Sequence, residues 1–148
     1  DEIQQTSDIT YRIFDWNRKD MKGQSRELQT ELALDVIDFK AAGKNKISKQ
    51  PIFNKTENLI NCEFFTTNIL SFNERISKDY NLIDSFVIYI CTDGEFLIRW
   101  NGNSEPVSKG ETVLLPAIIK EVILEPSPEA KVLEVFISED LNQYKSNN

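Results

Sequence analysis

A chain of 148 residues, 40% of them hydrophobic, is long enough for one ordinary globular domain with a real core. Its formal net charge of −7 argues against nucleic acid as a partner, because phosphate binding requires clustered lysine and arginine. No apolar run approaches the roughly 18 residues of a membrane span, and the acidic start Asp1-Glu2 lacks the basic region of a signal peptide. We therefore expect a cytoplasmic protein that binds neither nucleic acid nor membrane.

The sequence contains no histidine. This excludes a Ser–His–Asp triad and a Cys–His nucleophile within the chain, and it removes the commonest metal ligand. The five glycines form no phosphate-binding loop. Cys62 and Cys91 lie far apart, so we interpret them as buried free thiols of a reducing compartment, with a disulfide or a catalytic thiol as the alternatives.

The first predicted elements are a strand and a helix. Residues 9–14 (ITYRIF) are β-branched and aromatic and alternate with polar positions, which favours a strand. Leu28, Leu32 and Val36 recur at every fourth residue, which predicts an amphipathic helix over residues 26–37 with Ser25 as its cap. The Lys-, Gly- and Asn-rich residues 41–51 predict a surface connection.

From about residue 59 the pattern predicts only strands, separated by turn signals. The dipeptides Asp93-Gly94 and Asn101-Gly102 favour hairpin turns, which need positive φ. The close spacing of the strands is typical of a sandwich or a closed barrel. The predicted strands cover residues 61–72, 85–92, 95–101, 112–116, 121–124 and 131–137.

Two segments of this β half carry a family resemblance. Residues 85–98 (SFVIYICTDGEFLI) and 109–117 (KGETVLLPA) resemble the two signature segments of cupins. The resemblance implies a mainly β fold, namely a cupin-type double-sheet jelly-roll barrel with one connecting α-helix near the N-terminus. The metal-ligand positions of cupins correspond here to Asn81, Ile83, Val87 and Glu121. Since Ile83 and Val87 cannot bind a metal, the resemblance implies a metal-free barrel with Val87 in its core.

A longer segment narrows the family. Residues 2–18 (EIQQTSDITYRIFDWNR), followed by 26–28 (REL) and 33–39 (ALDVIDF), resemble type I mannose-6-phosphate isomerase in its short bacterial form. The similarity continues through residues 61–65 (NCEFF) to Phe136. That family builds two cupin barrels in one chain, and the first barrel holds a catalytic zinc. The resemblance implies that this chain is the C-terminal portion of such an isomerase.

The resemblance also implies a division of the chain. Residues 1–18 would be the terminal strand segment of an otherwise absent catalytic cupin, 19–55 a connecting helix and loop, 56–138 a metal-free C-terminal barrel and 139–148 a flexible tail. The parent enzyme would interconvert mannose 6-phosphate and fructose 6-phosphate in carbohydrate metabolism, with zinc as cofactor and a sugar phosphate as substrate. We expect the isolated chain to bind no zinc and to be inactive. Because its first strand would have lost its neighbours, we also expect self-association.

Two arginines are the candidate site residues. Arg12 matches the arginine of the family's Ser-Asp-x-x-x-Arg segment, which implies a catalytic role in stabilising developing negative charge. The alternative is a solvated or ion-paired side chain. Arg18 is the candidate substrate-binding residue, as a phosphate contact, with plain surface exposure as its alternative. We expect the neighbouring aromatic residues Tyr11, Phe14 and Trp16 to pack rather than to stack on a sugar.

Two other functions remain open. The chain could be a stand-alone, non-catalytic cupin that binds a sugar or a protein partner. It could also be a structural module whose barrel only supports the catalytic one. The upstream coding sequence distinguishes these hypotheses. An adjoining domain with histidines at metal-ligand spacing would favour the isomerase.

Overall fold

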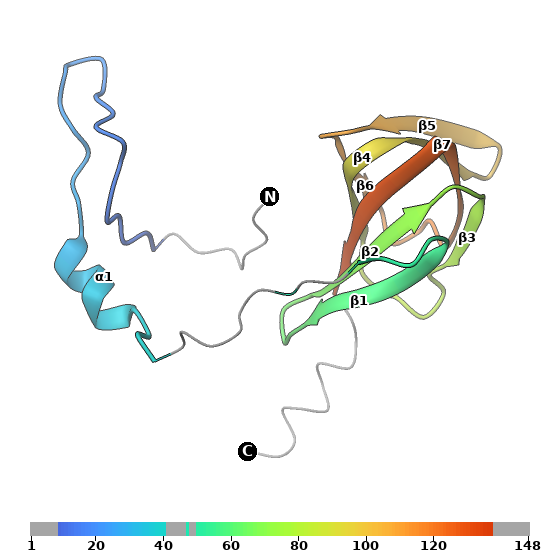
Figure 1. The fold of residues 1–148 in the computed structure, drawn as a ribbon, viewed down its shortest axis with the longest axis horizontal. Helices are drawn as coiled ribbons and strands as arrows, with labels where there is room; N and C mark the ends of the chain where they lie inside the picture. Colours follow the sequence, from blue (N-terminus) through green and yellow to red (C-terminus); the bar gives the residue numbers. More distant parts are fainter. Residues whose placement is uncertain (1–8, 41–46, 48–49, 138–148) are drawn as a thin grey trace. The chain divides into compact units, whose positions relative to one another are not determined.

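The computed structural model describes residues 9–40, 47 and 50–137, and the chain divides into two compact units between Lys46 and Ile47 (Figure 1). The predictions for residues 1–8 and for the tail after residue 137 lie outside the described residues, as does most of the predicted connection over 41–51. Among the described residues, no helix is long and apolar enough to cross a membrane.

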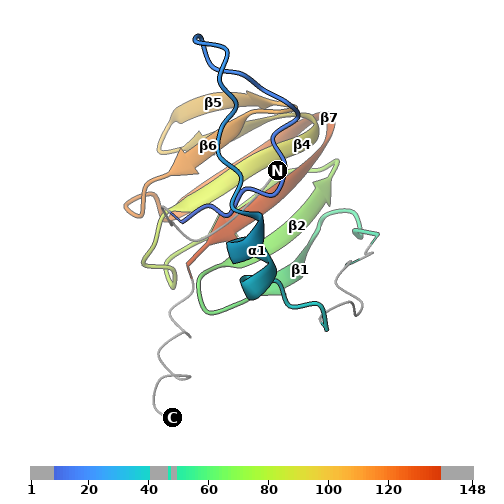
Figure 2. The same cartoon turned by 90° about the vertical axis from the view of Figure 1, so that its left-hand side faces the viewer.

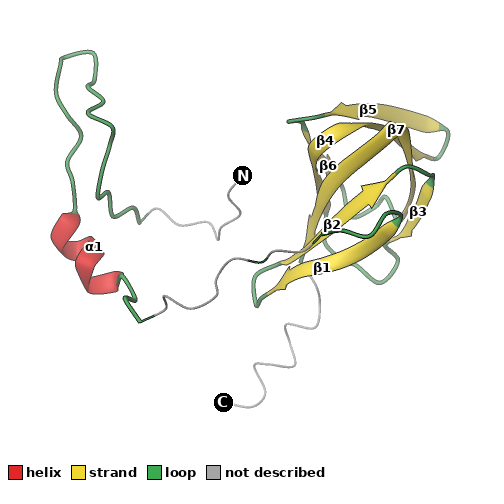
Figure 3. Cartoon of the chain, in the orientation of Figure 1, coloured by secondary structure: helices red, strands yellow, loops and turns green. Residues whose placement is uncertain are grey.

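The described residues 9–40 of the first unit contain one short helix, α1 (Thr30–Val36), shown in red in Figure 3. The prediction of a helix here is confirmed, but the predicted start at residue 26 and the predicted cap are wrong. The N-cap is Gln29, without a side-chain capping bond, because the amide of Gln29 is engaged with Arg12. Ser25 instead forms an isolated antiparallel bridge with Lys19.

The strand predicted over residues 9–14 is not formed. A strand needs a neighbouring strand for its backbone groups, and the backbone of Arg12 is satisfied in another way. Its N–H donates to Gln29 Oε1 at 3.0 Å, and its carbonyl accepts from the Gln29 N–H at 2.8 Å. The β-prone sequence of this segment is therefore not sufficient without a partner strand.

The second unit is a seven-stranded antiparallel barrel (Figures 1 and 2). The main strand order is β1-β2-β7-β4-β5, while β3 pairs with β7 and β6 pairs with β4. The strands are β1 (Lys55–Asn61), β2 (Thr66–Phe72), β3 (Ile76–Asp79), β4 (Val87–Trp100), β5 (Asn103–Ser108), β6 (Thr112–Leu115) and β7 (Glu121–Phe136).

Two strands are longer than predicted. The Asp93-Gly94 segment makes no hairpin but a bulge, so the two strands predicted over 85–101 form the single strand β4. Gly94 is required there: its φ is +71°, and a Cβ would lie 2.1 Å from the carbonyl oxygen of Glu129 on β7. The two strands predicted over 121–137 likewise form the single strand β7.

The remaining strand predictions are correct in part. Asn101-Gly102 forms the predicted hairpin, between β4 and β5, and both residues have positive φ. The strand predicted over 61–72 is confirmed only for β2, because residues 62–65 form a turn, and β1 was not predicted apart from Asn61. The polar strands β3 and β5 were not predicted from sequence.

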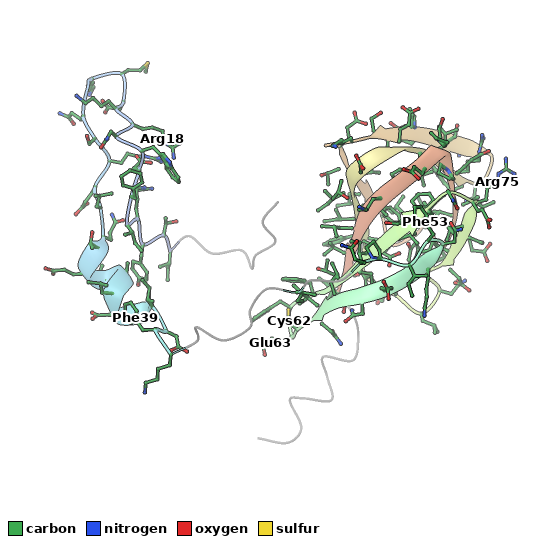
Figure 4. The ribbon with its side chains drawn as sticks, viewed as in Figure 1. Arg18, Phe39, Phe53, Cys62, Glu63 and Arg75 are labelled. Atoms are coloured by element: carbon green, nitrogen blue, oxygen red, sulfur yellow. The ribbon has the colours of Figure 1, made fainter. Side chains whose placement is uncertain are left out.

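The barrel core lies on the inward face of the long strands. Along β4 the buried side chains alternate as expected for a half-buried strand, and Val87 is in the core as predicted. Phe96 makes edge-to-face contacts with Phe72 and Tyr89. Cys91 is a buried free thiol as predicted, whereas Cys62, at the β1–β2 turn (Figure 4), is free but only half-buried.

Candidate functional site

The first unit gathers three arginines around one buried carboxylate, and we call Arg12, Asp15, Arg18 and Arg26 the arginine turn. Asp15 is 7% exposed. Arg26 donates to it through both Nε, at 2.8 Å, and Nη2, at 2.5 Å, which is the bidentate geometry that matches a guanidinium to a carboxylate. Arg18 Nη2 lies 3.1 Å from the same carboxylate, and the Arg18 N–H donates to the Asp15 carbonyl.

These contacts determine the charge of the turn. The hydrogen bond from Arg26 lowers the pKa of Asp15, and the positive charges of Arg26, Arg18 and Arg12 lower it further. The same pairing raises the pKa of Arg26. Asp15 is therefore ionised at neutral pH, and with three guanidinium groups the four residues carry a net charge of +2. An excess of positive charge at one turn suits an anionic ligand.

Arg12 and Arg18, the two arginines singled out in the sequence, differ in their environments. Arg12 is half-buried, and its Nη1 donates to the Glu27 carbonyl at 3.2 Å. The Arg18 side chain (labelled in Figure 4) is 63% exposed, and its guanidinium lies 5.8 Å from the centre of the Trp16 ring. The structure thus brings both arginines to one turn, with Arg18 presented to solvent and Arg12 held by the backbone.

Asp15 and Arg26 were missed as partners in the sequence. They are 11 residues apart and belong to no periodic element, so no helix or strand pattern pairs them. The aromatic residues expected to pack are only partly covered within this unit. Phe14 and Trp16 contact each other edge to face, but they are 58% and 72% exposed.

A second group of polar residues lies inside the barrel, and we call Asn68, Lys78, Tyr80, Tyr89 and Glu134 the interior cluster. Glu134, on β7, is 2% exposed. Its Oε1 accepts from the Tyr80 hydroxyl at 2.6 Å and lies 2.7 Å from Lys78 Nζ, and its Oε2 accepts from Asn68 Nδ2 at 2.8 Å. The ion pair and the hydrogen bonds offset the free-energy cost of burying this carboxylate in the barrel.

The two tyrosines complete the interior cluster. The hydroxyls of Tyr80 and Tyr89 bond to each other, and Tyr89 also donates to Glu134 Oε1 at 3.4 Å. Burial, reinforced by the negative charge of Glu134, raises the pKa of Tyr80 and of Tyr89. Both phenols are therefore neutral hydrogen-bonding groups at physiological pH.

The cupin metal-ligand positions carry side chains that do not form a metal site in this barrel. Asn81 and Glu121 are exposed, and Ile83 packs against the core. Within residues 9–40, 47 and 50–137, no three His, Cys, Asp or Glu side chains are arranged to hold a metal ion.

Solved structures place the barrel in a known class. The fold is similar to the crystal structure of mannose 6-phosphate isomerase from Bacillus subtilis, with a TM-score of 0.61 and 23% identity over 88% of this chain and 41% of that one. It is also similar to a Cupin 2 conserved barrel domain protein from Salinispora arenicola, with a TM-score of 0.53 and 13% identity over 70% of this chain and 100% of that one. The barrel is thus a cupin-type jelly roll, as the sequence predicted.

Sequence comparison identifies the family. Residues 54–135 match the family described as mannose-6-phosphate isomerase, cupin domain. The chain is 30% identical to mannose-6-phosphate isomerase ManA of Bacillus subtilis, over 88% of this chain and 42% of the relative. It is also 30% identical to mannose-6-phosphate isomerase of Streptococcus mutans, over 80% of this chain and 37% of the relative. The chain therefore belongs to the mannose-6-phosphate isomerase cupin family, and it spans about two fifths of the length of these relatives.

Proposed function

We propose that this chain is the C-terminal region of a cytoplasmic, zinc-dependent mannose-6-phosphate isomerase of carbohydrate metabolism. The observation that carries the proposal is the similarity to ManA over 88% of the chain, a length that extends beyond the barrel into the first unit. The barrel alone matches the cupin domain of this family, and the similarity that extends into the first unit supports the same enzyme.

The reaction explains why an arginine turn is useful. Interconversion of mannose 6-phosphate and fructose 6-phosphate moves a proton between two adjacent carbons and places negative charge on the oxygens of an enediolate. Arg12 is permanently charged and held by the Gln29 side chain and the Glu27 carbonyl. We assign it to stabilising that developing charge, because a fixed guanidinium needs little reorganisation during the reaction.

Arg18 is suited to a different task. Its exposed guanidinium is paired with Asp15 on one side and lies over Trp16 on the other. We assign it to the phosphate of the substrate, which is dianionic and can compete with Asp15 for the guanidinium.

The zinc of the parent enzyme would be held by residues that this chain does not contribute. The sequence has no histidine, and the described residues do not form a zinc site. We therefore expect the isolated chain to be inactive toward mannose 6-phosphate, with or without added zinc. Measurable turnover by the purified 148-residue chain would contradict this proposal.

The decisive experiment is a substitution in the full-length enzyme. Arg12→Ala should lower kcat about 100-fold, since the loss of one donor to a developing oxyanion has an effect of this size. Arg75→Ala is the matched control: Arg75 is an exposed, ion-paired arginine on the barrel, and its loss should leave the kinetics unchanged. Near-normal turnover by Arg12→Ala would remove Arg12 from the catalytic residues.

Arg18 is tested by separating binding from chemistry. Arg18→Gln should raise KM for mannose 6-phosphate about tenfold with a small change in kcat, because a phosphate contact is made in both the ground state and the transition state. A fall in kcat without a change in KM would contradict the assignment to phosphate binding.

A further inference from the structure

The barrel contains a pocket of about 360 Å³ beside the interior cluster. Its polar lining comes from four strands or their ends and consists of Thr56, Asn68, Ser77, Lys78, Asp79, Tyr80 and Glu134. Its apolar wall consists of Ile76, Ile83 and Phe136. A concave site with an apolar wall and a few converging polar groups is the usual form of a small-molecule site.

Two hydrogen-bond donors at this pocket, one N–H of Lys78 and the hydroxyl of Thr56, have no acceptor among the described residues. The Lys78 ammonium has three N–H groups, of which one is directed to Glu134 and one to Thr56 Oγ1, at 2.9 Å. The third remains available although the Lys78 side chain is only 12% exposed. The Thr56 hydroxyl accepts from Lys78, and its own proton has no acceptor within the described residues. Unpaired donors that face a pocket, one of them on a largely buried lysine, favour a ligand that supplies oxygen acceptors.

The energetics of the interior cluster also point to a ligand. A buried ion pair is rarely more stabilising than apolar side chains of the same volume, because both charges lose their hydration. Lys78 and Glu134 lie at inward positions that apolar residues could fill, as Leu124 and Val132 do elsewhere on β7. Stability of the barrel therefore does not explain these two charged residues, whereas recognition of a polar molecule does.

The charge of the pocket restricts the class of ligand. Lys78 is already paired with Glu134, and the carboxylate of Asp79 at the pocket rim brings the formal charge of the lining to −1, which disfavours a phosphate. The mixed donors and acceptors fit hydroxyl groups, which can donate and accept at once. The apolar wall fits the C–H surface of a compact carbon skeleton.

We propose that the pocket between β1, β2, β3 and β7 binds a small neutral polyol or unphosphorylated sugar. Lys78 and Thr56 donate to hydroxyl oxygens of the ligand, and Ile76, Ile83 and Phe136 contact its carbon skeleton. This proposal concerns the barrel alone and does not depend on the isomerase reaction or on the arginine turn.

The test is a titration of the 148-residue chain followed by ¹H–¹⁵N NMR. The neutral probes are D-mannitol and D-glucose. D-Glucose 6-phosphate, which differs from glucose by its charged phosphate, is the anionic control. Both neutral probes should shift the amide signals of Thr56, Asn68, Lys78 and Glu134, with Kd on the order of 1 mM. Glucose 6-phosphate should bind this pocket at least about tenfold more weakly, owing to the two carboxylates.

Three variants make the test specific. Thr56→Val, a near-isosteric change at a half-buried position, should weaken binding about fivefold by removing one hydrogen bond. Lys78→Met should abolish the shifts. Lys109→Met removes the same atoms from an exposed ion pair on the same barrel and should bind like the wild type.

The absence of shifts at these four amides with both neutral probes would overturn the proposal. So would unchanged binding by Thr56→Val, which folds even if Lys78→Met does not. Equal binding of glucose and glucose 6-phosphate would overturn the assignment to neutral ligands.

Discussion

Glu134 is the buried carboxylate of the described part of the barrel, and the contribution of its ion pair with Lys78 to stability can be measured. Lys78→Met would leave it without its counter-ion, although Tyr80 and Asn68 would still donate to it. We expect a loss of about 3 kcal/mol in the free energy of unfolding, because an uncompensated buried charge is strongly destabilising. Urea denaturation of the variant and of the wild type provides the comparison.

A double variant separates the charge from the packing. In Lys78→Met/Glu134→Leu both charges are absent, and we expect most of the lost stability to return. If the double variant is as unstable as Lys78→Met, the defect comes from lost packing, and the interior cluster is not held by its electrostatics.

Asp15 provides a prediction on pH. Its pKa is lowered in the folded state by the hydrogen bond from Arg26. A group with a depressed folded pKa stabilises the fold above its unfolded pKa of about 4 and loses this contribution as the pH falls through the folded value. We expect the arginine turn to loosen below about pH 4, seen as loss of the bonded Arg26 Nε–H signal in NMR.

Asp15→Asn should show the same loosening already at neutral pH. In that variant the Arg26 signal should lack the acidic transition, since the titrating carboxyl group is gone. A transition that persists unchanged in Asp15→Asn would assign it to another carboxyl group.

At the scale of the elements, Gly94 holds the bulge of β4 against β7. Gly94→Ala should destabilise the barrel by about 3 kcal/mol or more, because the new methyl group would meet the Glu129 carbonyl at 2.1 Å and the positive φ adds strain. Gly102→Ala is the matched control: its φ of +79° is similar, but nothing lies within 4 Å of the new Cβ.

Thermal denaturation followed by circular dichroism compares the two glycine variants. Gly102→Ala should cost about 1 kcal/mol, the strain of a left-handed residue alone. Equal losses in the two variants would show that the backbone conformation, and not the contact between β4 and β7, makes Gly94 necessary.

The same elements show which parts of the fold were predictable from sequence. The central strands were predicted because their inward residues alternate, as in Val87, Tyr89 and Cys91. β3 and β5 were not, because they are short and largely polar, and their pairing with β7 and β4 supplies what their sequences lack. Asp93-Gly94 has the sequence of a hairpin turn but forms a bulge. This bulge is packed against the carbonyl of Glu129 on β7, and a contact with a residue so far along the chain cannot be predicted from the local sequence.

At the scale of the whole molecule, the two units differ in how much core they have. Within residues 9–40, which belong to the first unit, Ala33 is the buried apolar residue, whereas Ile9, Phe14 and Trp16 are more than half exposed. Exposed apolar side chains of this kind favour association. We therefore expect the 148-residue chain to self-associate with rising concentration in sedimentation velocity.

A chain without residues 1–46 is the control for self-association. It retains the whole second unit and should sediment as a monomer over the same range of concentrations. If the full chain is a monomer at every concentration, the exposed residues of the first unit do not drive association. If the shorter chain associates equally, the barrel is responsible.

The two candidate sites differ in how far the sequence could predict them. Arg12 and Arg18 lie within seven residues of each other, so a short motif was enough to single them out. The residues of the interior cluster come from β2, β3, β4 and β7 and from the residue that follows β3. Its bonded pair Asn68 and Glu134 are 66 residues apart in the sequence. Such a cluster exists only once the strand register is known, and for this reason the sequence gives no sign of it.

The position of β7 in the barrel has a consequence for how the chain folds during synthesis. β2, β3 and β4 all pair with this last strand, and β2 makes its pairs over residues 130–136. The earlier strands therefore leave the ribosome without their main partner, and the barrel can close only after the end of β7 has emerged. Until then, the apolar faces of β2 and β4 are open to chaperones and to other nascent chains, so that the pace of translation near residue 136 bears on the yield of folded protein.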